Sequence, residues 1–131
     1  MVCGGCPRDL HLGLKPRDID IFVNYCDANT WYKLFRLLGF KQKRHEFYYN
    51  KLILDVIPTE KRTSTSIIRN FDCDVCKWYI KDGKPTPLNQ AIKYKTNRRI
   101  ATFIKKKDLF GTCNIRSEKF TKRGWTCIIN E

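Results

Sequence analysis

The stretch GGCPRDLHLGLKPRDIDIFVNY, residues 4–25, constrains the fold more than any other part of the sequence. Its Gly-Gly pair breaks regular structure, and Pro7 suits the first position of a short helix that ends at Gly13. Residues 18–25 then alternate in polarity and are rich in β-forming residues, which predicts a strand. A glycine turn, a short helix and a strand therefore follow one another directly.

The rest of the chain mixes helical and strand patterns. We expect strands at 40–49, 51–58, 72–80 and 125–130, and helices at 30–38 and 115–123, with a helical turn in SIIRNF and a helix-prone basic stretch at 88–107. LILDVIP is almost wholly apolar, which is typical of a central strand buried on both faces. The predicted fold is α+β, with a mixed or antiparallel central sheet flanked by helices.

A chain of 131 residues with 42% hydrophobic residues has enough apolar material for one core. We expect a single domain over 1–131, with a core at 1–80 and a basic C-terminal segment at 81–131. No apolar run approaches a membrane span, and no secretory signal follows Met1. The expected location is the cytoplasm, without contact to a membrane.

Three acidic residues predict a metal site. In a strand, residues two apart project from the same face, so Asp18 and Asp20 lie together. Asp55 is the one charge within LILDVIP, and burying it is costly without a counter-charge. Mg²⁺ or Mn²⁺ shared by the three carboxylates would supply that charge. The alternative for Asp18 and Asp20 alone is a solvated sheet face.

The glycine turn upstream suits a phosphate. Gly4 and Gly5 allow backbone N–H groups to approach a phosphate closely. Arg8 and Arg17 can add charge-assisted hydrogen bonds to it. The alternative for Arg8 is a structural ion pair with Asp9 that fixes the turn.

Net charge indicates a polyanionic partner. Lys and Arg number 26 against 13 acids, which gives a formal charge of +13. A basic stretch interleaved with aromatic residues suits single-stranded nucleic acid; its candidate residues are Lys93, Lys95, Arg98, Arg99, Lys105, Lys106 and Lys107. The alternatives are a solvated helix face and a merely soluble basic surface.

The seven cysteines favour reduced thiols. Cys3 and Cys6, and Cys73 and Cys76, have the spacing of zinc ligands. The two pairs are far apart in sequence, and Cys73 and Cys76 fall in an expected strand, where they would point to opposite faces. We therefore expect small buried thiols, with a zinc module as the alternative.

The run GGCPRDLHLGLKPRDIDIFV resembles the GGxVRDxLLGxxPxDxD signature of CCA-adding enzymes and bacterial poly(A) polymerases, members of the DNA polymerase β-type nucleotidyltransferase superfamily. The resemblance implies that Gly4, Gly5, Arg8 and Asp9 form the nucleotide loop and that Asp18 and Asp20 bind metal, with Asp55 as the third carboxylate. IRNFDCDVCK is more loosely similar to the family's RRDFTINA motif. By that match, Asp72 and Arg69 join the nucleotide-binding residues.

The likeness covers the first ~80 residues, and the chain departs from the family elsewhere. Cys6 and Pro7 replace a small residue and Val, and the EDxxR-type base-selecting motif is absent. The sequence has no room for the neck, body and tail of the tRNA-maturing enzymes. It looks like the small stand-alone nucleotidyltransferases of viruses and phages, which would place it in the host-cell cytoplasm.

The function that the resemblance implies is a metal-dependent nucleotidyltransferase. It would move a nucleoside monophosphate from a nucleoside triphosphate such as ATP to an acceptor hydroxyl of RNA or tRNA, and release pyrophosphate. One alternative is a transferase that nucleotidylates a protein or small molecule. Another is a non-catalytic nucleic-acid-binding module on a degenerate transferase fold. A homodimer or a partner subunit would cover an exposed sheet edge.

Overall fold

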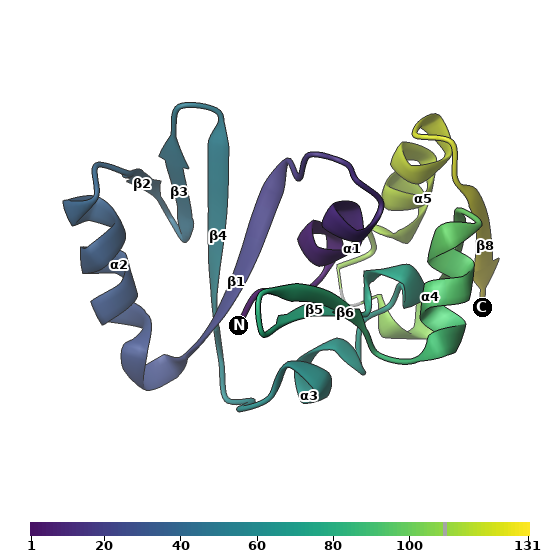
Figure 1. The fold of residues 1–131 in the computed structure, drawn as a ribbon, viewed down its shortest axis with the longest axis horizontal. Helices are drawn as coiled ribbons and strands as arrows, with labels where there is room; N and C mark the ends of the chain where they lie inside the picture. The colour runs from purple at the N-terminus through teal and green to yellow at the C-terminus, as the bar shows by residue number, and fades with distance from the viewer. Residues whose placement is uncertain (109) are drawn as a thin grey trace.

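The computed structural model describes residues 1–108 and 110–131 and confirms the predicted α+β class (Figure 1). The helices are α1 (Gly5–His11), α2 (Ala28–Leu37), α3 (Ser64–Ile68), α4 (Gln90–Asn97) and α5 (Cys113–Lys122). The strands are β1 (Asp18–Asn24), β2 (Lys41–Lys43), β3 (Glu46–Tyr49), β4 (Leu52–Thr59), β5 (Trp78–Lys81), β6 (Lys84–Pro87), β7 (Ile100–Ile104) and β8 (Thr126–Asn130). Short 3₁₀ turns span Tyr25–Asp27, Asp74–Cys76 and Lys105–Lys107.

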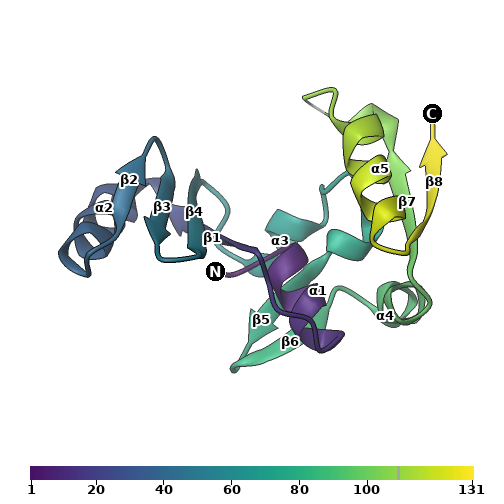
Figure 2. The same cartoon turned by 90° about the horizontal axis from the view of Figure 1, so that it is seen from above.

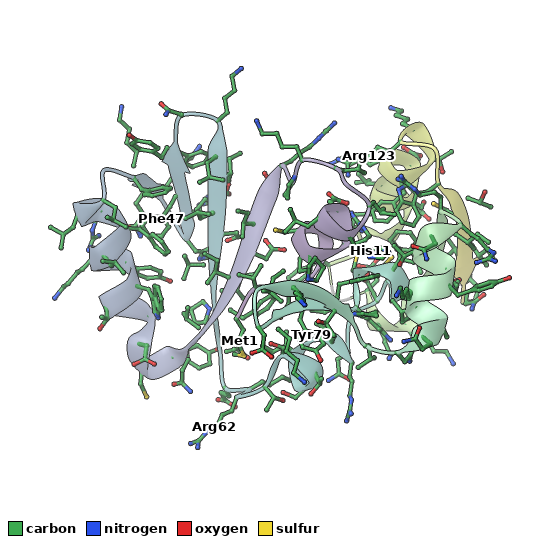
Figure 3. The ribbon with its side chains drawn as sticks, in the orientation of Figure 1. Met1, His11, Phe47, Arg62, Tyr79 and Arg123 are labelled. Carbon is green, nitrogen blue, oxygen red and sulfur yellow. The ribbon has the colours of Figure 1, made fainter. Side chains whose placement is uncertain are left out.

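The main sheet has the strand order β2-β3-β4-β1. Strands β1 and β4 are parallel, whereas β2, β3 and β4 pair antiparallel, so the sheet is mixed as predicted. Helix α2 covers one face through a core that includes Val23, Phe35, Leu54 and Val56. Phe47 is fully buried between this helix and the sheet (Figure 3). The apolar residues of β1 and β4 that alternate with the acids therefore form the core.

Residues 1–4 connect the main sheet to the hairpin β5–β6. The Phe22 N–H donates to the Met1 carbonyl at 2.7 Å, and the Ile80 N–H donates to the Val2 carbonyl at 3.0 Å. The Gly4 N–H donates to the Trp78 carbonyl at 2.9 Å. This segment therefore lies between β1 and β5 and fixes where α1 begins (Figures 1 and 2).

The C-terminal part packs around the parallel pair β7–β8. Its core includes Val75, Phe103, Phe120 and Trp125, which lie on four different segments. Figure 2 shows α5 and β8 on the opposite side of α1 from α2. Helix α1 therefore lies between the main sheet and the C-terminal part.

Three predicted elements have different bounds in the structure. The expected strand at 40–49 is divided into β2 and β3 by a tight turn in which Arg44 has φ 59°. The expected strand at 72–80 begins with the 3₁₀ turn Asp74–Cys76, because the Asp74 carboxylate accepts the Val75 N–H at 2.7 Å. The helix-prone stretch ends at Asn97, and Ile100–Ile104 forms β7 instead.

Over residues 1–108 and 110–131, no helix combines sufficient length with sufficient apolar character to cross a membrane.

Candidate active site

The three acidic residues converge on one face of the main sheet. Asp20 and Asp55 are directly paired across the parallel strands β1 and β4. Asp18 precedes Asp20 by two positions, so its side chain projects from the same face. This face is opposite the one that α2 covers, because Ile19, Ile21 and Val23 alternate with the acids and pack on the α2 side. Asp18 is exposed, and Asp20 and Asp55 are partly buried.

Burial and electrostatic repulsion raise the pKa of two members of this group, and the opposing effect of His45 on Asp55 is smaller. Burial, followed by the charges of Asp55 and Asp18, raises the pKa of Asp20 from 3.8 to about 6. Burial is also the main cause that raises the pKa of Asp55. Within the described part of the chain, Asp55 Oδ1 is buried and accepts no hydrogen bond. An orphaned carboxylate oxygen beside two further acids is the chemistry that a divalent cation satisfies.

The carboxylate oxygens of the three acids do not all approach one common position. As the side chains are placed in residues 1–108 and 110–131, no three His, Cys, Asp or Glu groups are arranged to hold an ion. The donor set nevertheless fits Mg²⁺ or Mn²⁺, because all of its atoms are carboxylate oxygens on adjoining strands.

A glycine elbow adjoins the acids at the start of α1. Gly4 has φ 96°, a conformation that residues with a Cβ rarely adopt. A Cβ at Gly4 would lie 3.7 Å from Asp20 Oδ2, so the backbone passes directly over the carboxylate. Gly5 follows, and a Cβ there would lie 3.2 Å from Arg8 Nη2. The two glycines thus let the chain turn closely between the acids and α1.

Arg8 is held by neighbouring residues rather than exposed. Its side chain is 5% exposed and pairs with Asp9 at 3.0 Å. The guanidinium also lies 5.0 Å from the Phe120 ring centroid and 5.3 Å from that of Trp125. The pair with Asp9 is the arrangement of the structural alternative for Arg8, and the aromatic contacts fix α1 against α5.

A cavity of about 880 Å³ lies between the acids and the C-terminal part. Its acidic wall contains Asp9, Asp18 and Asp20. Its basic wall contains Arg99, Arg116, Lys119 and Arg123 of the C-terminal part, whereas Lys15 and Arg17 lie on the acidic side, in the segment that leads into β1. Arg123 lies on the side of α5 that faces α1 (Figure 3). The cavity therefore sets carboxylates opposite a row of cationic side chains.

A second cavity, of about 450 Å³, reaches Asp20 from the other side of the elbow. It is lined in part by Gly4, Asp72, Lys107 and Arg116. Arg116 Nη1 donates to both carboxylate oxygens of Asp72, at 2.6 and 2.7 Å. Asp72 is therefore near the acids, but its charge is already paired with Arg116.

Most of the predicted nucleotide-binding residues line the two cavities, whereas most of the lysines and arginines predicted to bind nucleic acid do not. Around the two cavities it brings together Gly4, Gly5, Arg8, Asp9, Arg17, Asp18, Asp20, Asp72, Arg99 and Lys107. Asp55 joins this group through its pairing with Asp20.

The remaining predicted residues line neither cavity among the described residues: Arg69, Lys93, Lys95, Arg98, Lys105 and Lys106. Lys95 instead forms an ion pair with Asp74 and donates to Thr102 Oγ1 at 2.6 Å. Arg98 stacks on Tyr94, with 3.4 Å between the guanidinium carbon and the ring centroid.

Sequence reasoning missed the basic face of α5. Arg116, Lys119 and Arg123 are spaced by three and four residues, which puts them on one side of a helix. That spacing was a usable signal. The spacing of Cys73 and Cys76 was noted as that of zinc ligands, and small buried thiols were expected, but Cys76 lines both cavities. Its place there was not foreseen, because its segment was expected to be a strand.

Solved structures of tRNA-processing enzymes share this fold. A CCA-adding enzyme of Thermotoga maritima complexed with tRNA matches 99% of this chain with a TM-score of 0.65 and 20% identity. A CCA-adding enzyme in complex with CTP matches 99% with a TM-score of 0.67 and 20% identity. An apo tRNA-processing enzyme matches 96% with a TM-score of 0.63 and 16% identity. No protein-family profile and no curated protein sequence matches the chain.

The chain spans 34%, 35% and 40% of the lengths of these three structures. It resembles the head domain of CCA-adding enzymes along nearly its whole length, which confirms the resemblance seen in residues 4–23. At these identities the likeness establishes the nucleotidyltransferase-like fold.

Proposed function

We propose that this chain is a nucleotidyltransferase that moves a nucleoside monophosphate from a nucleoside triphosphate to a hydroxyl group of RNA and releases pyrophosphate. The observation that carries the proposal is the pairing of Asp20 with Asp55 on parallel strands, beside Asp18, at the wall of a cavity with a basic opposite wall. The fold shared with CCA-adding enzymes supports the same class of reaction.

Both walls of the cavity have a role in this reaction. Asp18, Asp20 and Asp55 would hold Mg²⁺ or Mn²⁺, as the orphaned Asp55 Oδ1 and the raised pKa of Asp20 indicate. When bound, such ions lower the pKa of the attacking hydroxyl and neutralise charge on the leaving group. The carboxylates fix where the reacting phosphate lies, and positioning of this kind is a large part of catalysis of phosphoryl transfer.

The basic wall would receive the polyanionic reactants. Arg17, Lys119 and Arg123 line the cavity, so their charges face a triphosphate or an RNA end placed against the acids. Gly4 and Gly5 let the backbone approach the phosphates next to Asp20. Arg8 would act by holding α1 against α5, because its guanidinium is buried on Asp9 and two aromatic rings.

Incubation with each labelled nucleoside triphosphate, RNA and Mg²⁺ or Mn²⁺ tests the proposal. We expect labelled RNA and equimolar pyrophosphate from the wild type and at least ~100-fold less from Asp20→Asn. Asp82→Asn is the matched control, since it makes the same chemical change in an exposed turn of the β5–β6 hairpin and should leave the rate unchanged.

Other outcomes separate the alternatives. If the label appears on a protein or a small molecule and not on RNA, the chain is still a nucleotidyltransferase, but its acceptor is that molecule. If RNA binds equally well without metal and to Asp20→Asn, and no nucleotide is transferred, the proposal is overturned and the chain is a nucleic-acid-binding module.

A further inference from the structure

Cys73 and Cys76 form a close pair in the turn that links the core to β5. Residues Asp74–Cys76 are a 3₁₀ turn, and the Cys76 N–H donates to the Cys73 carbonyl at 3.2 Å. Such a turn brings the first and fourth Cα atoms to within about 7 Å, and disulfides span about 4.4–6.8 Å between Cα atoms. Both cysteines are free thiols in the structure. The expectation that they point to opposite faces of a strand is therefore wrong.

Two guanidinium groups flank the Cys76 sulfur. Arg8 Nη1 donates to Sγ at 3.5 Å, and Arg116 Nη2 approaches it at 4.0 Å. A hydrogen bond with the Cys73 thiol lowers the pKa of Cys76, and the two arginines lower it further against the opposing effect of burial. The same hydrogen bond raises the pKa of Cys73. The lowered pKa favours the thiolate of Cys76, which is the nucleophilic form of cysteine, and the raised pKa favours a protonated Cys73 thiol.

Cys76 is reached from both cavities. It lines the cavity of about 880 Å³ and the cavity of about 450 Å³, and it is only partly buried, whereas Cys73 is buried. A small polar molecule that enters either cavity therefore meets the Cys76 sulfur before that of Cys73.

We propose that Cys76 and Cys73 are an oxidation site that reacts with a hydroperoxide and closes to a disulfide in the wall shared by the two cavities. The Cys76 thiolate attacks a peroxide oxygen, the O–O bond breaks, and the departing hydroxide takes a proton to become water. Cys76 is then a sulfenic acid. The Cys73 sulfur attacks it, the S–S bond forms, the S–O bond breaks, and the hydroxyl leaves with the Cys73 proton as a second water. Two thiols are oxidised and one hydrogen peroxide is reduced.

Closure of the disulfide changes the site. The Cys76 sulfur that accepts from Arg8 and Arg116 then belongs to a neutral disulfide and can no longer be a thiolate, and these two arginines line the larger cavity. The modification does not depend on which reaction the cavity performs, because it concerns only the two sulfurs and an added peroxide.

Mass spectrometry of the full chain treated with hydrogen peroxide tests the proposal. After the remaining thiols are alkylated, we expect a peptide in which Cys73 and Cys76 are joined and unalkylated, formed before Cys26 is oxidised. Cys26 is the internal reference, because it is exposed and lies outside both cavities among the described residues. Iodoacetamide should label Cys76 about tenfold faster than Cys26 at neutral pH.

Variants locate each step. Cys73→Ser should stop at a sulfenic acid on Cys76 that a cyclic 1,3-dione traps, Cys76→Ser should abolish both products, and Cys26→Ser should change neither. If the wild type oxidises Cys26 first and yields no product joining Cys73 to Cys76, the proposal is overturned. That measurement needs no variant, so a folding defect cannot obscure it. Loss of nucleotidyl transfer would leave these mass changes as they are.

Discussion

Asp20 and Asp55 lie side by side on parallel strands, and neither charge is balanced by a cationic side chain that bonds to it in the described residues. Burial and mutual repulsion raise the pKa of Asp20 to about 6. Two such acids side by side need either a proton or a cation between them.

Mg²⁺ or Mn²⁺ should stabilise the wild-type chain against heat. A ligand at about 100 times its Kd adds about 2.7 kcal/mol to the free energy of unfolding. Asp20→Asn and Asp55→Asn should each abolish most of this increase, because each removes a carboxylate ligand. Differential scanning calorimetry with and without the ion measures it. An equal increase in the wild type and both variants would mean that the ion binds elsewhere.

The metal-free protein should become less stable as pH rises. The folded-state pKa of Asp20 is raised from 3.8 to about 6, so the folded chain binds this proton more tightly than the unfolded chain. The free energy of unfolding should therefore fall between about pH 4 and pH 6, by at most ~3 kcal/mol. Urea unfolding in the presence of a chelator measures this.

Asp20→Asn should flatten that pH dependence and be more stable than the wild type above about pH 6. Asp82→Asn, in the exposed hairpin turn, should keep the wild-type profile. Identical pH profiles of the wild type and Asp20→Asn would contradict the raised pKa of Asp20, whereas carboxylates with a lowered pKa, such as Asp108, contribute equally to both.

Asp72→Ala should destabilise the fold by about 2–4 kcal/mol. It leaves Arg116 without its carboxylate in a position where the arginine side chain is only 33% exposed. A double-mutant cycle with Arg116→Met should show a coupling of about 1–3 kcal/mol. The exposed pair of Lys105 and Glu131, at 3.6 Å, is the control, and Glu131→Gln should cause no measurable change.

The basic face of α5 should contribute to RNA binding. Lys119→Gln and Arg123→Gln should each weaken binding of single-stranded RNA and reduce the slope of log K against log salt by about 0.7 per lost phosphate contact. Lys33→Gln on α2, at the far side of the molecule, should leave that slope unchanged (Figure 1). Fluorescence anisotropy over a salt series gives the slopes. Equal effects of all three substitutions would indicate general electrostatic attraction without a defined face.

The sequence predicted the acidic side of the site because that side depends on local rules. Alternation puts Asp18 and Asp20 on one face, and the apolar context of Asp55 marks a buried strand. The parallel pairing of β1 with β4, which sets Asp20 beside Asp55, is a long-range contact that only the folded chain displays.

The C-terminal half was harder to predict because its structure depends on distant partners. Residues 100–104 form a strand through parallel pairing with β8, which overrides a helix-prone context. The Asp74 carboxylate accepts N–H groups from Val75 and Thr102 and so replaces the expected strand with a turn. Lys95, which was expected to bind nucleic acid, likewise forms an ion pair with Asp74 instead.

Trp125 has a practical consequence for solution studies. It is one of three tryptophans, and of the three it is the one that lines the larger cavity in the described part of the chain, with Arg8 at 5.3 Å and Arg99 at 5.5 Å from its ring centroid. Trp78 is fully buried and Trp31 lies on α2. The intrinsic emission of a Trp31→Phe variant would therefore report the arrival of a ligand in the cavity without an attached dye.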